Sequence, residues 1–140
     1  MEEIDSEQKQ LDIYGRCDEC NLIMTDFNWC HPCNAKFFKE NFNSWTSGNN
    51  NIDTFIQETQ LSAKNHFNVL EWIDFDKFSE IKYIAEGGYG TVYRAKWKDG
   101  YIFIRDNKNK SWGRLQPKML VALKSLNNSK DVTLEFINEV

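Results

Sequence analysis

The sequence predicts an α+β fold in three successive parts: a small four-cysteine segment, a short helical linker and a mainly antiparallel β-sheet that ends in a partial helix. Three observations carry this prediction. All four cysteines of the chain fall within residues 17–33. Apolar residues recur at helical spacing between residues 52 and 78, and after residue 80 they alternate as strand residues do.

Length and composition restrict the class of protein. A chain of 140 residues makes one ordinary domain or two very small ones, and 41% hydrophobic residues are typical of a folded protein. The formal net charge of −4 gives no basic field for nucleic acid. The amino terminus is acidic and polar, unlike a secretory signal, and no apolar run is long enough to span a membrane. We therefore expect an intracellular, cytoplasmic protein without a nucleic-acid or membrane partner.

Changes in composition mark boundaries along the chain. The polar stretch over residues 43–51 indicates a loop, and the helical spacing after it predicts one or two short helices with Asn51 or Asp53 near an N-cap. The predicted parts are an acidic tail over 1–13, the four-cysteine segment over 14–40, the polar loop and helical linker over 41–78, and the sheet with its partial helix over 79–140.

The alternation after residue 80 predicts a sheet on both sides of a glycine cluster. Asp99-Gly100 predicts a hairpin turn, because this pair tolerates the positive φ that tight hairpins need. The elements predicted around this turn are strands over 81–85 and 92–97, a second hairpin over 101–114, a strand over 119–126 and a helix over 130–140.

The cysteines form the pattern C-x2-C-x9-C-x2-C, read from Cys17 and Cys20 and from Cys30 and Cys33. Each pair lies on a tight turn that brings two sulfurs toward one ion, and a tetrahedral zinc ion binds four thiolates. Clustered cysteines in a reducing compartment favour metal, so we expect a structural zinc site without an open coordination position. Free or redox-active thiols and disulfides are the alternatives. His31 is either a neighbour of the site or a substitute ligand.

The glycine cluster predicts a backbone cradle for phosphates. Gly87, Gly88 and Gly90 would let backbone amides approach a polyanion with no Cβ in the way, although a plain β-turn would use the same residues. The chain has no Walker-type phosphate loop. The turn joins strand to strand, so it is not a dinucleotide fingerprint that opens a helix.

The segment around these glycines resembles the glycine-rich loop of protein kinases. The resemblance implies that Tyr89 is the aromatic tip of the loop and that Val92 lies beneath the adenine of ATP. Ala85 departs from the pattern, because it stands where the first glycine of the loop is expected. The residues implied to contact the nucleotide are Ile84, Ala85, Glu86, Gly87, Gly88, Tyr89, Gly90, Thr91 and Val92.

A second segment, Val121-Ala122-Leu123-Lys124, resembles the V-A-I-K strand of the same family. The resemblance implies that Ala122 lines the nucleotide site and that Lys124 holds the α- and β-phosphates. It further implies that a helical glutamate aims this lysine, and Glu139 is assigned to that role with Glu135 as the alternative. The resemblance covers about residues 78–140.

The family implies an ATP-dependent phosphotransferase that uses Mg²⁺ and acts on a protein substrate. Its aspartate base and magnesium ligands lie in H-R-D and D-F-G segments that this sequence does not contain, so we expect the 140-residue chain to be catalytically inactive by itself. The alternative is a zinc-nucleated interaction module for a partner protein, built on a truncated kinase-like scaffold. The transcript beyond the codon for Val140 would distinguish these hypotheses, because the first requires both missing segments there.

Overall fold

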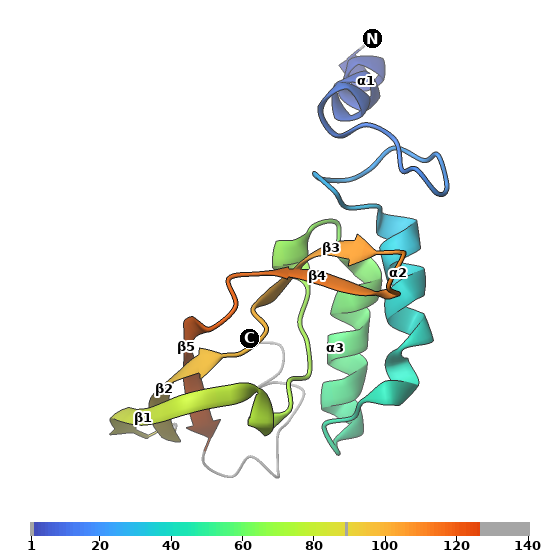
Figure 1. The fold of residues 1–140 in the computed structure, drawn as a ribbon. Coiled ribbons are helices and arrows are strands. Elements are labelled where there is room, and N and C mark those ends of the chain that lie inside the picture. Colours follow the sequence, from blue (N-terminus) through green and yellow to red (C-terminus); the bar gives the residue numbers. More distant parts are fainter. Residues whose placement is uncertain (1, 89, 127–140) are drawn as a thin grey trace. The chain divides into compact units, whose positions relative to one another are not determined.

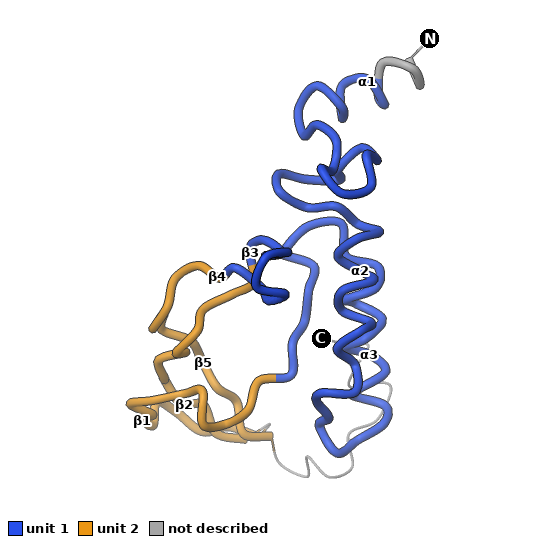
Figure 2. The backbone as a smooth tube through the Cα atoms, turned by 45° about the vertical axis from the view of Figure 1, so that its right-hand side comes forward, with its two compact units in different colours: residues 1–72, 103–113 blue, residues 73–102, 114–140 orange. Residues whose placement is uncertain are grey.

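The computed structural model of the chain describes residues 2–88 and 90–126 (Figure 1). The chain divides into two compact units (Figure 2). The first unit consists of residues 1–72 and 103–113, and the second consists of residues 73–102 and 114–140. A segment of the first unit therefore interrupts the second unit along the sequence. The mixed α+β class, with helices and antiparallel sheets, is confirmed.

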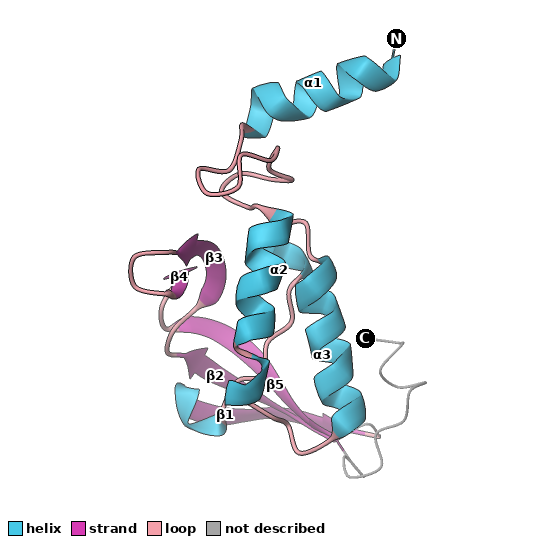
Figure 3. Cartoon of the chain, turned by 90° about the vertical axis from the view of Figure 1, so that its right-hand side faces the viewer, coloured by secondary structure: helices cyan, strands magenta, loops and turns pink. Residues whose placement is uncertain are grey.

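The α-helices of the described chain all belong to the first unit and are drawn in cyan in Figure 3. They are α1 (Glu2–Tyr14), α2 (His31–Glu40) and α3 (Asn50–Ser62). Single 3-10 turns lie at Phe42–Ser44 and His66–Asn68 in the first unit and at Phe75–Lys77 in the second. The segment predicted as an acidic tail forms α1, and α2 was not predicted. Within the described residues, none of the helices combines the length and the apolar character needed to cross a membrane.

Helix α3 confirms the helix predicted in the linker, but it begins earlier than expected. Asn49 is the N-cap residue, because its side-chain oxygen accepts hydrogen bonds from the backbone N–H groups of Asn51 and Ile52 at 2.9 and 3.3 Å. Asn51 and Asp53, the expected caps, lie inside the first turn. Asp53 instead accepts hydrogen bonds from the backbone N–H and the hydroxyl of Ser47, which fixes the loop in front of the helix.

Trp29 lies at the centre of the first unit. Its side chain is 1% exposed, and its indole N–H donates a hydrogen bond to the backbone carbonyl of Ala63 at 3.0 Å. Its ring centroid lies 6.4 Å from that of Phe38 on α2, and Ile56 on α3 is also buried. Helices α2 and α3 pack side by side (Figure 3). Because Trp29 directly precedes Cys30, this core is continuous with the four-cysteine segment.

A β-hairpin supplies the rest of this core. It consists of β3 (Tyr101–Asp106) and β4 (Ser111–Leu115). Trp112 of β4 stacks on Phe38 with ring centroids 4.3 Å apart and on Trp29 with centroids 6.1 Å apart, and Phe37 meets it edge-on at 4.9 Å. Large aromatic rings dominate the burial of apolar surface in small cores. These contacts explain why residues 103–113 belong to the first unit.

The second unit contains one antiparallel sheet of three strands in its described part. The strands are β1 (Phe78–Gly87), β2 (Gly90–Trp97) and β5 (Met119–Leu126), in the order β1-β2-β5. Ala95 of β2 is fully buried, whereas β1 is mostly exposed. The strands predicted on both sides of the glycines and over residues 119–126 are confirmed.

The hairpin predicted at Asp99-Gly100 is wrong, although a turn is present there. Gly100 adopts a positive φ of 74°, and a Cβ at this position would lie 2.0 Å from the backbone oxygen of Leu115. The turn joins β2 to β3, but β2 pairs with β1 and β5 whereas β3 pairs with β4. The second hairpin, predicted over residues 101–114, is confirmed as β3–β4. The ring contacts of Trp112 hold this hairpin in the first unit, which a local turn signal cannot anticipate.

Replacing Trp29 with alanine should lower the free energy of unfolding of the first unit by about 3 to 5 kcal/mol, because the substitution empties the centre of its core. Urea denaturation followed by circular dichroism measures this loss. The control is Phe67→Ala, since the side chain of Phe67 is 82% exposed and its removal should cost less than about 1 kcal/mol. Equal losses in the two variants would contradict a central position for Trp29.

Candidate functional site

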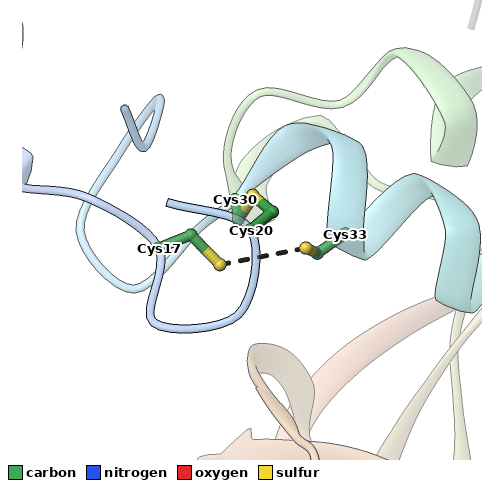
Figure 4. A group of neighbouring side chains, drawn as sticks. All are labelled: Cys17, Cys20, Cys30 and Cys33. Carbon is green, nitrogen blue, oxygen red and sulfur yellow. Dashed lines mark hydrogen bonds between the residues drawn. The ribbon is translucent and has the colours of Figure 1, made fainter. Parts of the chain in front are cut away.

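The four cysteines converge on one point, as predicted from their spacing (Figure 4). Their sulfur atoms all lie within 4.8 Å of one another. The Sγ atoms of Cys17 and Cys33 are 3.8 Å apart, and those of Cys20 and Cys30 are 3.5 Å apart. Sulfurs of a disulfide lie about 2.05 Å apart. All four cysteines are therefore free thiols in this structure, and each close contact joins one pair to the other.

A tight loop places the first pair. The backbone N–H of Cys17 donates a hydrogen bond to the carbonyl of Leu22 at 2.8 Å, and the N–H of Asn21 donates to the carbonyl of Cys17 at 2.9 Å. Asn21 adopts a positive φ of 62°, a conformation that asparagine tolerates better than most residues. The loop therefore reverses within a few residues, and Cys17 and Cys20 project from it together.

The start of helix α2 places the second pair. Cys30 is the N-cap residue of this helix, and its carbonyl accepts a hydrogen bond from the backbone N–H of Asn34 at 2.9 Å. Pro32 lies in the first turn, where its missing N–H costs no helical hydrogen bond. Cys33 follows in the same turn. The second pair thus lies at the amino end of α2, where the partial positive charge of the helix favours thiolates.

Burial opposes the ionisation of Cys30 and Cys33. Burial raises the pKa of Cys17, but the backbone N–H groups of Cys20 and Glu19 and the neighbouring thiols lower it to a net value of about 7. Burial raises the pKa of Cys30, and it raises the pKa of Cys33 to about 11. A divalent cation would lower these values, because it binds the thiolate form of each cysteine.

The donor set fits a metal ion such as zinc. Four sulfurs bound at about 2.3 Å to a tetrahedral zinc ion lie about 3.8 Å apart. The two close sulfur contacts of this structure, 3.5 and 3.8 Å, agree with that spacing. His31 is not needed as a ligand, because its Nε2 atom lies 2.8 Å from the carbonyl oxygen of Leu61. Four cysteine ligands would fill every coordination position, as in structural zinc sites.

The glycine loop connects β1 to β2, and Gly87 lies opposite Gly90 across it. Gly90 has a φ of 141°, and a Cβ there would lie 1.9 Å from the carbonyl oxygen of Ser125 on β5. The close approach of β2 and β5 therefore requires glycine at this position with or without a ligand. A Cβ on Gly88 would meet no atom within 4 Å, so the position of Gly88 opens on space. Sterically, a side chain is excluded at Gly90 but not at Gly88.

The register of the sheet places Lys124 relative to the residues that the resemblance assigns to the nucleotide. Val92 of β2 lies directly opposite Lys124 of β5, and Arg94 lies opposite Ala122. Residues directly opposite each other in an antiparallel pair share one face of the sheet, and so do alternate residues of a strand. Val92, Ala122 and Lys124 therefore lie on one face.

The remaining residues of the predicted loop fall in β1 and β2. Ala85 lies opposite Val92 and Glu86 lies opposite Thr91, so Ala85 shares the face of Val92. Ile84 is 53% exposed. Tyr89, Glu135 and Glu139 lie outside the described residues, as does the helix predicted over 130–140.

One residue that contacts the cysteine segment was not indicated by any sequence pattern. Arg105 of β3 donates hydrogen bonds to Asn34 and to Glu19, which lie 71 and 86 residues away in the sequence. Glu19 lies between Cys17 and Cys20, and Asn34 follows Cys33. Neither motif spacing nor periodicity relates residues so far apart, so only the folded chain reveals this contact.

Comparison with protein-family models, with curated proteins and with solved structures finds no match for the chain. The function must therefore be inferred from the residues of the chain and their geometry.

Replacing Cys20 with serine should reduce bound zinc from about one equivalent per chain to well below one, because a tetrahedral structural site needs all four thiolates. Elemental analysis after gel filtration measures the stoichiometry. Ser47→Ala is the control, since Ser47 lies away from the cluster in the loop before α3 and should leave the zinc content unchanged. Full zinc content in the Cys20 variant would rule out the four-cysteine site.

Proposed function

We propose that the second unit is the nucleotide-holding lobe of a protein-kinase-like domain. The observation that carries this proposal is the pairing of Val92 with Lys124 beside the glycine loop. It supports a site in which an apolar residue contacts adenine while an ammonium group on the same face contacts phosphate. An outward-facing Lys124, on the face opposite to Val92, would have removed the basis for the proposal.

The charge of this face also supports a polyanionic ligand. Lys82 lies opposite Arg94, so both share the face of Lys124. Lys96, two residues beyond Arg94, lies there too and forms an ion pair with Glu80 at 2.8 Å. That contact holds the pKa of the Glu80 carboxyl below its usual range, so the pair is ionised at neutral pH. The side chains on this face therefore carry a net positive charge, which attracts phosphate groups.

The proposed roles follow from the family resemblance. Lys124 would hold the α- and β-phosphates of ATP, the backbone of the glycine loop would cover them, and Val92 and Ala122 would contact adenine. Glu139 would aim the lysine. Phosphoryl transfer to a protein would additionally need an aspartate base and Mg²⁺ ligands, so the described residues account for nucleotide binding and not for the transfer step.

We further propose that the first unit holds a structural zinc ion on Cys17, Cys20, Cys30 and Cys33. Four soft thiolate ligands suit zinc, and Cys30 lies next to the core residue Trp29. The metal would thus stabilise a unit whose apolar core is small.

A second candidate function is a zinc-nucleated interaction module that binds a partner protein. The observation that favours it is the exposure of large apolar side chains on the first unit, among them Phe27 at 61% and Phe67 at 82%. Such side chains on a small folded unit are typical of contact surfaces when they lie together. Under this hypothesis, the sheet of the second unit need not bind a nucleotide.

An acyl-phosphate derivative of ATP tests the nucleotide site, because it transfers its acyl group to a lysine amine beside the bound phosphates. The amine displaces the phosphate and forms an amide, which mass spectrometry locates in the sequence. We expect labelling at Lys124 that falls as unmodified ATP is added in excess. This readout suits weak binding, because the covalent product accumulates.

Lys39 on α2 is the internal control, because it is exposed, belongs to the first unit and has no assigned nucleotide contact. Its labelling should be unaffected by ATP. If all exposed lysines react alike and ATP protects none of them, the nucleotide-holding lobe is ruled out and the interaction module is favoured.

A further inference from the structure

We propose that Arg105, on the β3–β4 hairpin, is a positioning residue of the metal centre that joins the two cysteine pairs. The inference rests on the proposed zinc site and extends it to a residue outside the cysteine motif. The hairpin would then be the third segment that builds the site, after the first cysteine loop and the start of α2, although it lies far from the cysteines in sequence.

The contacts of Arg105 reach both halves of the cysteine motif. Its Nη1 atom donates a hydrogen bond to Oε2 of Glu19 at 2.8 Å, and its Nε atom donates to Oδ1 of Asn34 at 3.0 Å. Glu19 lies on the loop between Cys17 and Cys20. Asn34 directly follows Cys33 on α2. One planar guanidinium therefore fixes the distance between the two turns that carry the sulfurs, which a fork of rigid donors can do.

Two of these three groups are largely removed from water. The side chain of Arg105 is 10% exposed and Asn34 is 2% exposed, whereas the side chain of Glu19 is 49% exposed. A charge removed from water is costly unless it is compensated by charge and hydrogen bonds. Zinc with four thiolates carries a net charge of about −2, which a buried guanidinium complements. Arg105 and two of the cysteines, Cys17 and Cys30, line one hollow of about 190 Å³.

Asn34 independently indicates that a hydrogen-bond acceptor binds in this hollow. Its Nδ2 atom is buried and has no hydrogen-bond partner, whereas its Oδ1 atom is bonded to Arg105. Buried polar atoms without a partner are rare in folded proteins. Asn34 lines the same hollow as Cys17 and Cys30, and thiolate sulfur accepts hydrogen bonds. By holding the amide oxygen, Arg105 leaves the N–H₂ group as the half of this side chain available to an acceptor there.

The hairpin has a second attachment that does not involve Arg105. Trp112 of β4 stacks on Trp29 with an interplanar angle of 13° and on Phe38 with an angle of 29°. A variant of Arg105 should therefore keep the hairpin on the first unit. The loss of Arg105 can then be measured as a change in metal affinity within a folded protein, because groups that orient metal ligands typically change affinity by tenfold to 100-fold.

The test compares zinc affinities of the full chain and its variants by competition with a chromophoric chelator. Arg105→Gln should weaken zinc binding by about tenfold to 100-fold. Arg105→Lys should recover part of the loss, because lysine keeps the charge but cannot bind Glu19 and Asn34 as a fork. Circular dichroism of each variant checks that it folds. If Arg105→Gln does not fold, the zinc affinity of Arg105→Lys still tests the proposal.

Arg16→Gln is the matched control. Arg16 lines the same hollow and directly precedes Cys17, but its side chain donates to the backbone carbonyl of Asn21, in the first cysteine loop, and to neither Asn34 nor the second pair within the described residues. If Arg105 acts by joining the two pairs, this variant should weaken zinc binding by less than about threefold. Equal losses for the Arg16 and Arg105 variants would indicate a general charge effect and overturn the positioning role.

Cobalt binding separates this inference from the zinc site on which it rests. Co²⁺ bound by four thiolates gives strong absorption in the visible and near-ultraviolet, and the Arg105→Gln variant should keep that spectrum at higher metal concentrations. A four-thiolate spectrum in the wild type with an unchanged affinity in the variant overturns the role of Arg105 and leaves the metal centre standing. A wild type without that spectrum overturns both.

Discussion

Four thiol sulfurs lie within 4.8 Å of one another, where they could hold one metal ion, and much of the first unit is organised around this cluster. The reversal at Asn21 presents Cys17 and Cys20 from one side, and the start of α2 presents Cys30 and Cys33 from the other. Since Trp29 directly precedes Cys30, the turn that positions a ligand also inserts the largest fully buried side chain of the described chain into the core. The proposed metal centre and the core are therefore linked by adjacent residues.

The β3–β4 hairpin extends this arrangement to a distant part of the sequence. In the sequence, the hairpin lies between β2 and β5, which belong to the second unit. Its residues 103–113 nevertheless belong to the unit that contains the cysteines. Arg105 holds the hairpin beside the cysteine turns and Trp112 holds it against the aromatic core. Strands β2 and β5, which carry Val92 and Lys124, therefore flank in sequence a segment that packs in the unit of the cysteines.

The sequence predicted the features that depend on local chemistry. Two C-x2-C pairs with a short spacer predicted that the four cysteines meet, and alternating residues predicted the strand over residues 119–126, because both patterns act between near neighbours. Helix α2 was missed although Pro32 after Cys30 was an available signal for a helix start.

The features that escaped prediction depend on contacts between distant residues. Asp99-Gly100 encodes a turn, but which strands pair after it is decided by the ring contacts of Trp112. Arg105 reaches Glu19 across 86 residues, and no periodicity spans that distance. Likewise, Gly90 was predicted to be a phosphate-binding glycine. The structure shows that glycine is needed there because the backbone of Ser125 lies too close for a Cβ atom.

In the proposed metal centre, the four cysteines hold one zinc ion in a closed tetrahedral site. X-ray absorption at the zinc edge of the metal-loaded protein measures the ligand atoms and their distances. We expect a first shell of four sulfur scatterers at about 2.3 Å and no nitrogen or oxygen neighbours. A shell that contains nitrogen or oxygen at about 2.0 to 2.2 Å in place of one or more sulfurs would contradict it.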